Sequence, residues 1–373
     1  MKTLLSTLAA AMFAAAPAAA QPQAIETETG TIHVETVASG LVHPWGMAFL
    51  PDGRMLVTER PGTLRILDSD FNLSEPLSGV PEVAAQGQGG LLDVAVDPDF
   101  ASNQLVYLTF AEPGSGGAST AAARGRLGEA GLEDVEVIFR QVPKVGGGNH
   151  FGSRLVFGGD GTLFIGLGDR FKFDPAQDLS SHIGKVVRIN PDGSVPDDNP
   201  FVGDDGAMPE IWSYGHRNIQ GGTRHPETGE VWFHEHGPRG GDEINVARAG
   251  ENYGWPIVSW GNHYDGREIP DPPSQPQFAE SVHVWTPSIA PSGMTFYTGD
   301  VFPEWQGDLL VGALVAQSLI RLSLDGQEVT NEERIVLGAR IRDVAQGPEG
   351  AIYVITDASN GQVLRLTPDQ KDG

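Results

Sequence analysis

The chain has 373 residues, a formal net charge of −25 at neutral pH, 49 glycines, 27 prolines and no cysteine. A protein this acidic is not expected to bind nucleic acid or an anionic membrane surface. Without cysteine it can form neither a disulfide framework nor a thiolate metal site. The glycine and proline content, with few long apolar periodic runs, favours an all-β architecture.

The first 20 residues have the features of an export signal. Lys2 supplies a positive charge, the stretch 4–16 is apolar, and 18–20 form a small-residue cleavage site before Gln21. This stretch is too short to span a membrane, and no other segment is long enough. We therefore expect a signal peptide at 1–20, a single domain over 21–373, and a periplasmic or secreted protein.

One sequence motif recurs six times along the mature chain. It consists of an apolar alternating run, a turn rich in proline, aspartate and glycine, and a second apolar run. The copies lie at 47–58, 92–110, 155–165, 223–233, 294–311 and 344–354. Each copy predicts three or four short strands, and radial repetition of such sheets forms a β-propeller, here with six blades. The alternative is a sandwich of similar hairpins. The six-fold count disfavours it.

A histidine and an aspartate flank the third copy. His150 precedes the strand-like run 154–157, and Asp169 follows the run 162–167, with a Gly-Gly-Asp-Gly turn between the runs. Such a hairpin brings its outer ends together, so the carboxylate can hold one imidazole nitrogen and leave the other to accept a proton. A single histidine–aspartate contact of this kind is more often structural than catalytic. Residues in the other loops are therefore needed to indicate a functional site.

Polar and aromatic groups also recur where the blades are expected to begin. In a propeller these entries converge on one mouth of the central channel, where binding groups usually lie. The segments concerned are 87–90, 215–218, 234–243, 285–292 and 340–343.

With these phrases the chain resembles the soluble, pyrroloquinoline-quinone (PQQ)-dependent sugar dehydrogenases of the glucose/sorbosone dehydrogenase family. The likeness runs from about Gly40 to Leu366 and is closest to the bacterial periplasmic aldose sugar dehydrogenases. It implies oxidation of an aldose at C1 to the lactone, with hydride transfer to PQQ, polarisation of the cofactor by Ca²⁺, and electron transfer to an external quinone or cytochrome. We expect a monomer or a weak dimer.

The resemblance implies roles for individual residues. His150 matches the general base, and Asp169 matches the carboxylate that orients it. Arginine forks suit the carboxylates of PQQ, and calcium takes hard oxygen ligands. The cofactor contacts are matched by Gln88, Arg217, Asn218, Tyr264, Arg340 and Arg342, and an aromatic wall of the sugar site by Trp285. The ligands of a catalytic calcium are matched by the main-chain carbonyls of Gly237 and Pro238, and those of a structural calcium by Glu243 and Tyr253.

Two positions depart from the family pattern. Val315, in Gly-Ala-Leu-Val (312–315), stands where many relatives carry a lysine that contacts the quinone. Asn149 stands where some glucose-active relatives have aspartate. The first departure removes one expected cation from the cofactor site.

Two other functions compete with the dehydrogenase. A calcium-dependent propeller hydrolase, such as a lactonase, would use His234 and His236 with Glu235 and Asp242 nearby, although no third ligand from another blade is evident. A propeller that only binds carbohydrate is the other alternative. Each candidate residue also has a structural interpretation, such as packing between blades for Trp285.

Overall fold

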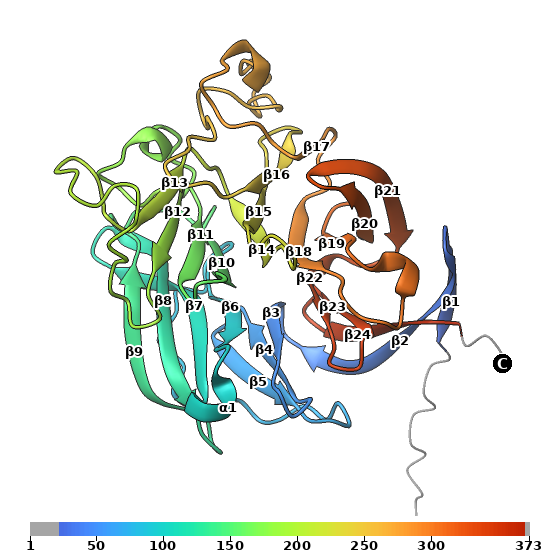
Figure 1. Cartoon of the computed structure of the whole chain (residues 1–373). Coiled ribbons are helices and arrows are strands. Elements are labelled where there is room, and N and C mark those ends of the chain that lie inside the picture. The colour runs from blue at the N-terminus through green and yellow to red at the C-terminus, as the bar shows by residue number, and fades with distance from the viewer. Residues whose placement is uncertain (1–21, 370–373) are drawn as a thin grey trace, which may run out of the picture.

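The protein, described by a computed structural model over residues 22–369, consists of six antiparallel sheets arranged around a common axis (Figure 1). The predicted all-β, six-bladed propeller is therefore confirmed. The signal peptide predicted at 1–20 lies outside the described residues. Within 22–369 no helix is long and apolar enough to cross a membrane.

Five blades follow one another along the chain, with the first strand of each innermost. Blade 1 has three strands and the next four have four each. Blade 1 contains β3 (Pro44–Phe49), β4 (Met55–Glu59) and β5 (Thr63–Leu67); blade 2 contains β6 (Leu91–Val96), β7 (Leu105–Gly114), β8 (Gly117–Leu127) and β9 (Leu132–Arg140); blade 3 contains β10 (Gly152–Phe157), β11 (Leu163–Leu167), β12 (Lys185–Ile189) and β13 (Ile211–Tyr214); blade 4 contains β14 (Ile219–Arg224), β15 (Val231–Glu235), β16 (Asp242–Val246) and β17 (His283–Trp285); blade 5 contains β18 (Pro291–Phe296), β19 (Leu309–Ala313), β20 (Ser318–Asp325) and β21 (Glu328–Val336).

Blade 6 closes the ring with strands from both ends of the chain. Its order is β1-β2-β24-β23-β22, where β1 (Gln23–Thr27) and β2 (Gly30–Leu41) precede blade 1 in sequence. The C-terminal strands are β22 (Ile341–Gln346), β23 (Ile352–Thr356) and β24 (Gly361–Pro368). β2 pairs with β24 from Ile32 opposite Pro368 to Leu41 opposite Gly361. Main-chain hydrogen bonds between the two ends thus hold the ring shut.

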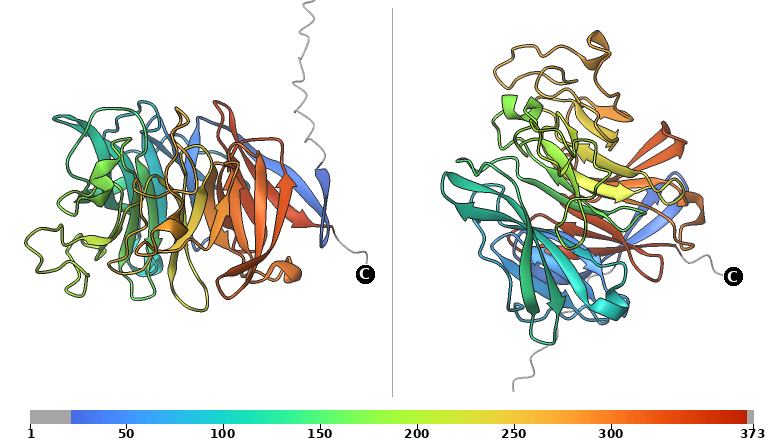
Figure 2. Two further views of the ribbon diagram at one scale, coloured as in Figure 1. Left: turned by 90° about the horizontal axis from the view of Figure 1, so that it is seen from above. Right: turned by 60° about the vertical axis from the view of Figure 1, so that its left-hand side comes forward.

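Within the described residues 22–369, helical structure is limited to four short segments, α1 (Phe100–Asn103), η1 (Asp174–Gln177), η2 (Pro272–Ser274) and η3 (Pro303–Trp305). The longest connection between strands, residues 247–282, joins β16 to β17 and carries η2 beyond the rim of blade 4 (Figures 1 and 2). Extra chain length is therefore placed in loops, where it does not disturb the blades.

Apolar layers between neighbouring blades form the core. Leu56 and Leu64 of blade 1 pack with Val94 and Leu108 of blade 2, and all four are buried. Equivalent clusters join blades 4 and 5 and blades 5 and 6. Because both faces of most strands are covered, the strands are apolar on both sides.

Every innermost strand has a register shift near its first residues, in β3, β6, β10, β14, β18 and β22. A bulge of this kind leaves a residue out of the pairing and turns its side chain in a new direction. In three blades the unpaired stretch contains Trp45, Gln220 or Arg342, and these side chains line the cavity described below. The repeated bulge therefore aims side chains at the axis.

A buried ion cluster fills the channel. Arg154 donates from Nη1 to Asp93 Oδ1 at 2.9 Å, and its Nη2 lies 3.0 Å from Asp343 Oδ1. The guanidinium carbon is 4.3 Å from the ring centre of Trp45. Burial and the nearby Asp343 carboxylate raise the pKa of Asp93 to about 6, against the opposing effect of Arg154. The cluster connects blades 1, 2, 3 and 6 at the axis.

The Arg154→Met variant should be destabilised by about 3–5 kcal/mol, since it leaves two buried carboxylates without their cation. The measurement is the free energy of unfolding in urea. Arg54→Met is the control, because Arg54 and its partner Asp52 have side chains that are 42% and 54% exposed. We expect that control to change stability by less than about 1 kcal/mol. Equal unfolding midpoints for the two variants would contradict the role of the cluster.

Candidate active site at one mouth of the channel

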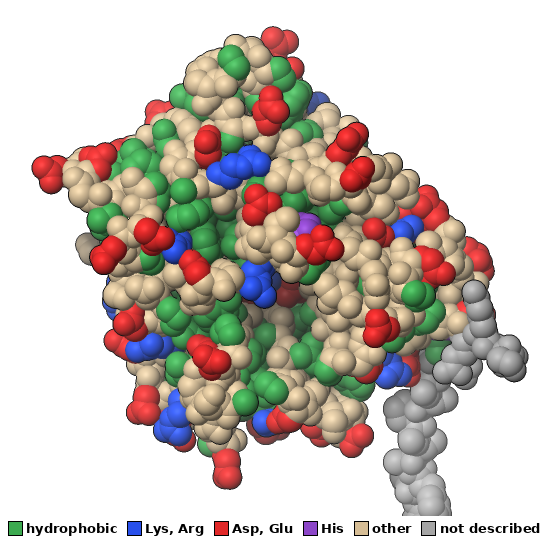
Figure 3. All heavy atoms as spheres, in the orientation of Figure 1, with side chains coloured by type: hydrophobic (Ala, Val, Ile, Leu, Met, Phe, Trp, Pro, Cys, Tyr) green, Lys and Arg blue, Asp and Glu red, His purple; other side chains and the backbone are tan. Residues whose placement is uncertain are grey.

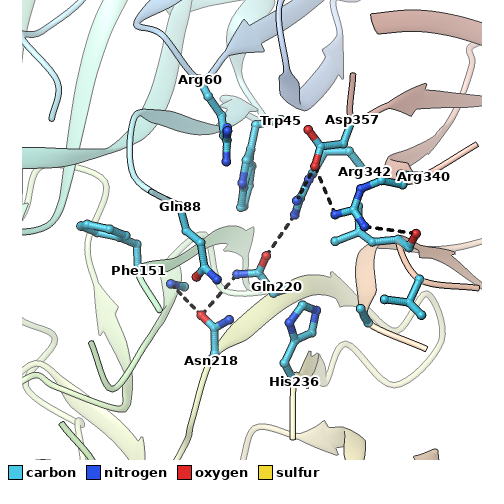
Figure 4. Close-up of a pocket in the computed structure, with 14 residues that line it drawn as sticks. Trp45, Arg60, Gln88, Phe151, Asn218, Gln220, His236, Arg340, Arg342 and Asp357 are labelled. Atoms are coloured by element: carbon cyan, nitrogen blue, oxygen red, sulfur yellow. Dashed lines mark hydrogen bonds and ion pairs between the residues drawn. The ribbon is translucent and has the colours of Figure 1, made fainter. Parts of the chain in front are cut away.

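A cavity of about 190 Å³ lies where the inner strands begin (Figure 4). Residues within or next to every blade line it, among them Trp45, Gln88, Phe151, Asn218, Val315 and Arg342. In the space-filling view the surface is hollowed near its middle, with a basic side chain at the edge of the hollow (Figure 3). The entries to the blades therefore meet at one place.

The cavity is cationic although the protein is strongly acidic. Its lining contains the guanidinium groups of Arg60, Arg340 and Arg342 but one carboxylate, Asp357. Asp357 accepts a hydrogen bond from Arg342 Nη2 at 3.2 Å and from Arg340 Nη2 at 3.5 Å. Desolvation lowers the pKa of Arg342 to about 10, a value at which it is still charged at neutral pH. Two positive charges are thus left uncompensated, an arrangement that favours an anionic ligand.

Side-chain amides form one wall of the cavity. Arg342 Nη1 donates to Gln220 Oε1 at 3.0 Å, and Gln220 Nε2 donates to Asn218 Oδ1 at 3.3 Å (Figure 4). Gln88 Oε1 accepts from the main-chain N–H of His150 at 2.8 Å. The amides therefore connect the cationic cavity to the loop that carries the histidine.

His150 and Asp169 are in contact, as the hairpin pattern predicts. His150 Nδ1 lies 2.6 Å from Asp169 Oδ1, and the strands between them, β10 and β11, pair with Gly152 opposite Leu167. Asp169 is fully buried and also accepts from the indole Nε1 of Trp255 at 2.8 Å and from the main-chain N–H of Phe171 at 2.7 Å. Three donors hold the carboxylate, so the imidazole is held in one orientation.

The environment keeps the His150 imidazole neutral. Burial lowers the pKa of His150 below its ordinary value, and the charges of Arg217 and Arg170 act in the same direction, while Asp169 opposes them. Since Nδ1 faces the carboxylate, Nε2 is the nitrogen that can accept a proton. No described residue hydrogen-bonds Nε2.

Arg217 joins the rim of the site to the loop after β15. Its Nη1 donates to the carbonyl oxygens of His236 and Gly237 at 2.8 and 2.7 Å, and its Nη2 donates to the Tyr264 hydroxyl at 3.0 Å. Tyr264 is 62% exposed and stacks with Phe171 at a centroid distance of 6.4 Å. Phe171 in turn meets the His150 ring edge-on at 5.0 Å. An aromatic rim therefore borders the histidine.

A second, smaller cavity contains three of the four predicted metal residues. Gly237, Glu243 and Tyr253 line a space of about 10 Å³, which is room for one ion or one water molecule. Desolvation and the neighbouring Glu235 carboxylate raise the pKa of Glu243 to about 8. Among residues 22–369 no group of three or more His, Asp or Glu side chains is arranged to hold a metal. A cation here would therefore need main-chain oxygens in addition to the Glu243 carboxylate.

Trp285, predicted as an aromatic wall of the sugar site, is not among the residues that line the cavity. It belongs to β17, the outermost strand of blade 4, and its indole is buried between blades 4 and 5. Its Nε1 donates to Glu332 Oε2 of blade 5 at 2.9 Å. Trp285 lies away from the cavity because its strand is the outermost of the blade and is far from the axis.

The two histidines considered for a hydrolase also lack a metal-site geometry. His236 Nε2 bonds to the carbonyl of Pro291 at 2.6 Å, and His234 is fully buried on β15 beside Gly221. Among the described residues, no cluster of acidic and histidine side chains surrounds them.

The structure adds cavity residues that the sequence analysis missed: Trp45, Arg60, Gln220 and Asp357. Arg60 and Asp357 directly follow the second strand of a blade, as do His236 and, one residue later, Asp169. A survey of second-strand ends as well as blade entries would have found them. Trp45 and Gln220 depend on the bulges, for which the sequence has no clear signal.

Known proteins match almost the whole chain. Residues 41–365 match the Glucose / Sorbosone dehydrogenase family. Aldose sugar dehydrogenase YliI of Escherichia coli (strain K12) is 48% identical over 346 residues, which cover 91% of this chain and 93% of that protein.

Solved structures agree with this match. The soluble aldose sugar dehydrogenase of Escherichia coli in its apo-form superposes with a TM-score of 0.87 at 47% identity, covering 90% of this chain and 99% of the other. The PQQ-bound aldose sugar dehydrogenase of Streptomyces coelicolor superposes with a TM-score of 0.74 at 29% identity, covering 90% and 98%. The predicted resemblance is confirmed: the chain belongs to the glucose/sorbosone dehydrogenase family and is an oxidoreductase.

Proposed function

We propose that the protein oxidises aldose sugars at C1 to the lactone with PQQ as the hydride acceptor. One observation carries this proposal: a buried, oriented and neutral imidazole directly precedes Phe151 and has its main-chain N–H bonded to Gln88, two residues that line a cavity with an excess of positive charge. The PQQ-bound relative from Streptomyces coelicolor supports the choice of cofactor.

The residues present suit PQQ. The Nε atoms of Arg60, Arg217 and Arg342 are buried without a hydrogen-bond partner among the described residues, so each guanidinium has donor capacity to spare. Arg340 and Arg342 would hold cofactor carboxylates, and Gln88 and Asn218 would donate from their amides to its oxygens. When bound, PQQ supplies the electrophilic quinone that accepts the hydride.

His150 would act as the general base. Its Nε2 takes the proton of the C1 hydroxyl, and the positive charge that forms on the ring is stabilised by Asp169 at 2.6 Å. Burial of the pair excludes water, which strengthens this interaction. The exposed ring of Tyr264 and its neighbour Phe171 would border the sugar.

We also propose two calcium sites. The carbonyls of Gly237 and Pro238 would hold the ion that polarises the cofactor, and Glu243 and Tyr253 would hold a structural ion. Arg217 already donates to the Gly237 carbonyl, but a carbonyl oxygen has two lone pairs and can serve both. The small cavity that Glu243 and Tyr253 line is of a size for the structural ion.

The cellular location and the electron acceptor of the protein are also part of this proposal. The expected export signal at 1–20 favours the periplasm or secretion, and a quinone or cytochrome outside the protein would take the electrons. The acidic surface is compatible with either.

The first test is His150→Ala, assayed in apo-protein supplied with PQQ and Ca²⁺ by dye reduction with glucose and other aldoses. Turnover should fall by about 10²–10⁴-fold, since the variant loses the base, while PQQ affinity stays unchanged. Because burial lowers the pKa of His150, the acid limb of kcat/KM for the unmodified protein should lie below pH 6.5. The control is His33→Ala, on the outer part of blade 6. Near-normal turnover of His150→Ala would remove the base assignment.

The second test concerns Trp255, a positioning residue. Trp255→Phe removes one donor from Asp169, so the carboxylate is less neutralised and stabilises the His150 imidazolium more. The pKa of His150, measured by NMR titration of its ring protons, should rise, and turnover should fall by at least about tenfold. Trp212→Phe is the matched control, because its indole donates to the carbonyl of Ala247 instead. An unchanged His150 titration in Trp255→Phe would contradict the positioning role.

The third test concerns the structural calcium site. Ca²⁺ should raise the thermal midpoint of the apo-protein, and Glu243→Gln should reduce that shift, whereas Glu75→Gln on the surface should not. Since the pKa of Glu243 is raised to about 8, the carboxyl is mostly protonated at neutral pH and must lose its proton to bind the ion. Calcium affinity should therefore increase as pH rises through about 8. A pH-independent affinity would exclude the Glu243 carboxylate as a ligand.

A further inference from the structure

Arg60 is a cation of the cavity for which the family resemblance gives no role. It directly follows β4, and its side chain points into the cavity with those of Trp45 and Gln88 (Figure 4). Its Nη1 donates to the Gly87 carbonyl at 3.2 Å, and its Nε is buried without a partner among the described residues. One neutral contact therefore accounts for little of its hydrogen-bonding capacity.

No carboxylate of residues 22–369 forms an ion pair with Arg60. The adjacent Glu59 pairs with Arg65, with Nη1 and Oε2 3.5 Å apart. The cavity carboxylate, Asp357, is shared by Arg340 and Arg342. A guanidinium left without a counter-ion beside other guanidinium groups costs free energy in the empty site, a cost that an anionic ligand would offset.

The backbone of Arg60 is held firmly, so the side chain has a defined starting point. Its N–H donates to the His43 carbonyl at 3.1 Å, and its carbonyl accepts from Leu91 N–H at 3.1 Å. Gly90 approaches so closely that a Cβ there would lie 2.0 Å from the Arg60 carbonyl oxygen. A larger residue at 90 would push Arg60 away from the cavity.

Val315 lines the same cavity and is 63% exposed. A lysine at this position would add a cation to the site, and valine adds none. The cation set of the cavity therefore consists of Arg60, Arg340 and Arg342. Asp357 forms ion pairs with Arg340 and Arg342. Arg60 is therefore the cavity arginine with no anionic partner within the described chain.

We propose that Arg60 binds a carboxylate of the cofactor and supplies the cation that Val315 leaves out. This inference rests on the proposed function, because it requires PQQ to be the anion in the cavity. Through this contact Arg60 would act in cofactor affinity rather than in proton transfer, since it does not touch the His150 ring.

The experiment is calorimetric titration of PQQ into the calcium-loaded apo-protein. Arg60→Gln should raise the Kd at least about tenfold, since a hydrogen bond between charged groups is lost. Arg60→Lys should retain part of the affinity, and adding Val315→Lys to Arg60→Gln should restore most of it. Arg54→Gln, which changes an exposed arginine, is the matched control and should bind as the unmodified protein does.

Thermal unfolding of the apo-proteins separates ligand binding from a structural role. Arg60→Gln should unfold at the same or a higher temperature, because it removes a charge that repels Arg342. Wild-type PQQ affinity in Arg60→Gln would overturn the inference about Arg60 and leave the proposed function intact. A weakened affinity that accompanies a lowered apo midpoint and is not restored by Val315→Lys would also overturn it. Failure of the unmodified protein to bind PQQ would overturn the proposed function itself.

Discussion

The structure depends on the Arg154 guanidinium, buried at the axis between the carboxylates of Asp93 and Asp343. Each blade by itself is a small sheet, and the apolar contacts between blades are non-directional, whereas an ion pair requires a defined distance. The cluster takes its members from blades 2, 3 and 6 and lies against Trp45 of blade 1, so it sets the relative positions of four inner strands. Buried ion pairs add little net stability, and geometric specificity is the better-attested use. Here that specificity determines where the cavity residues of those strands stand.

The net charge of the cavity lining is opposite in sign to that of the whole molecule. The chain carries a net charge of −25, yet three arginines and one aspartate line the cavity. The acidic surface repels anions, so an anion is attracted only once it is inside the cationic cavity. This makes the cavity more selective for the anions that fit it. A ligand that exploits it needs negative charge to match the guanidinium groups that Asp357 leaves uncompensated.

The repeat made the fold predictable, because each blade repeats its own apolar runs and turn within about fifty residues. The His150–Asp169 contact was predictable for the same reason, as a hairpin joins the two residues locally. The position of Trp285 away from the cavity was not predictable, because its distance from the axis depends on how many strands precede it in the blade. Trp45, Gln220 and Arg342 lie in bulges, whose direction depends on register shifts between strands. Of these three, Arg342 was assigned through the family resemblance alone.

Burial and nearby cations also influence the candidate base. Burial lowers the pKa of His150 most, Asp169 raises it, and Arg217 and Arg170 lower it further, so desolvation and opposing charges together keep the ring neutral. An anion bound in the cavity would partly offset the effect of the arginines, because opposite charges at short range in a buried site are weakly screened. The imidazole would then be a stronger base when the cofactor site is filled than when it is empty. Proton abstraction and cofactor occupancy are thereby coupled through charge alone, without any movement of His150.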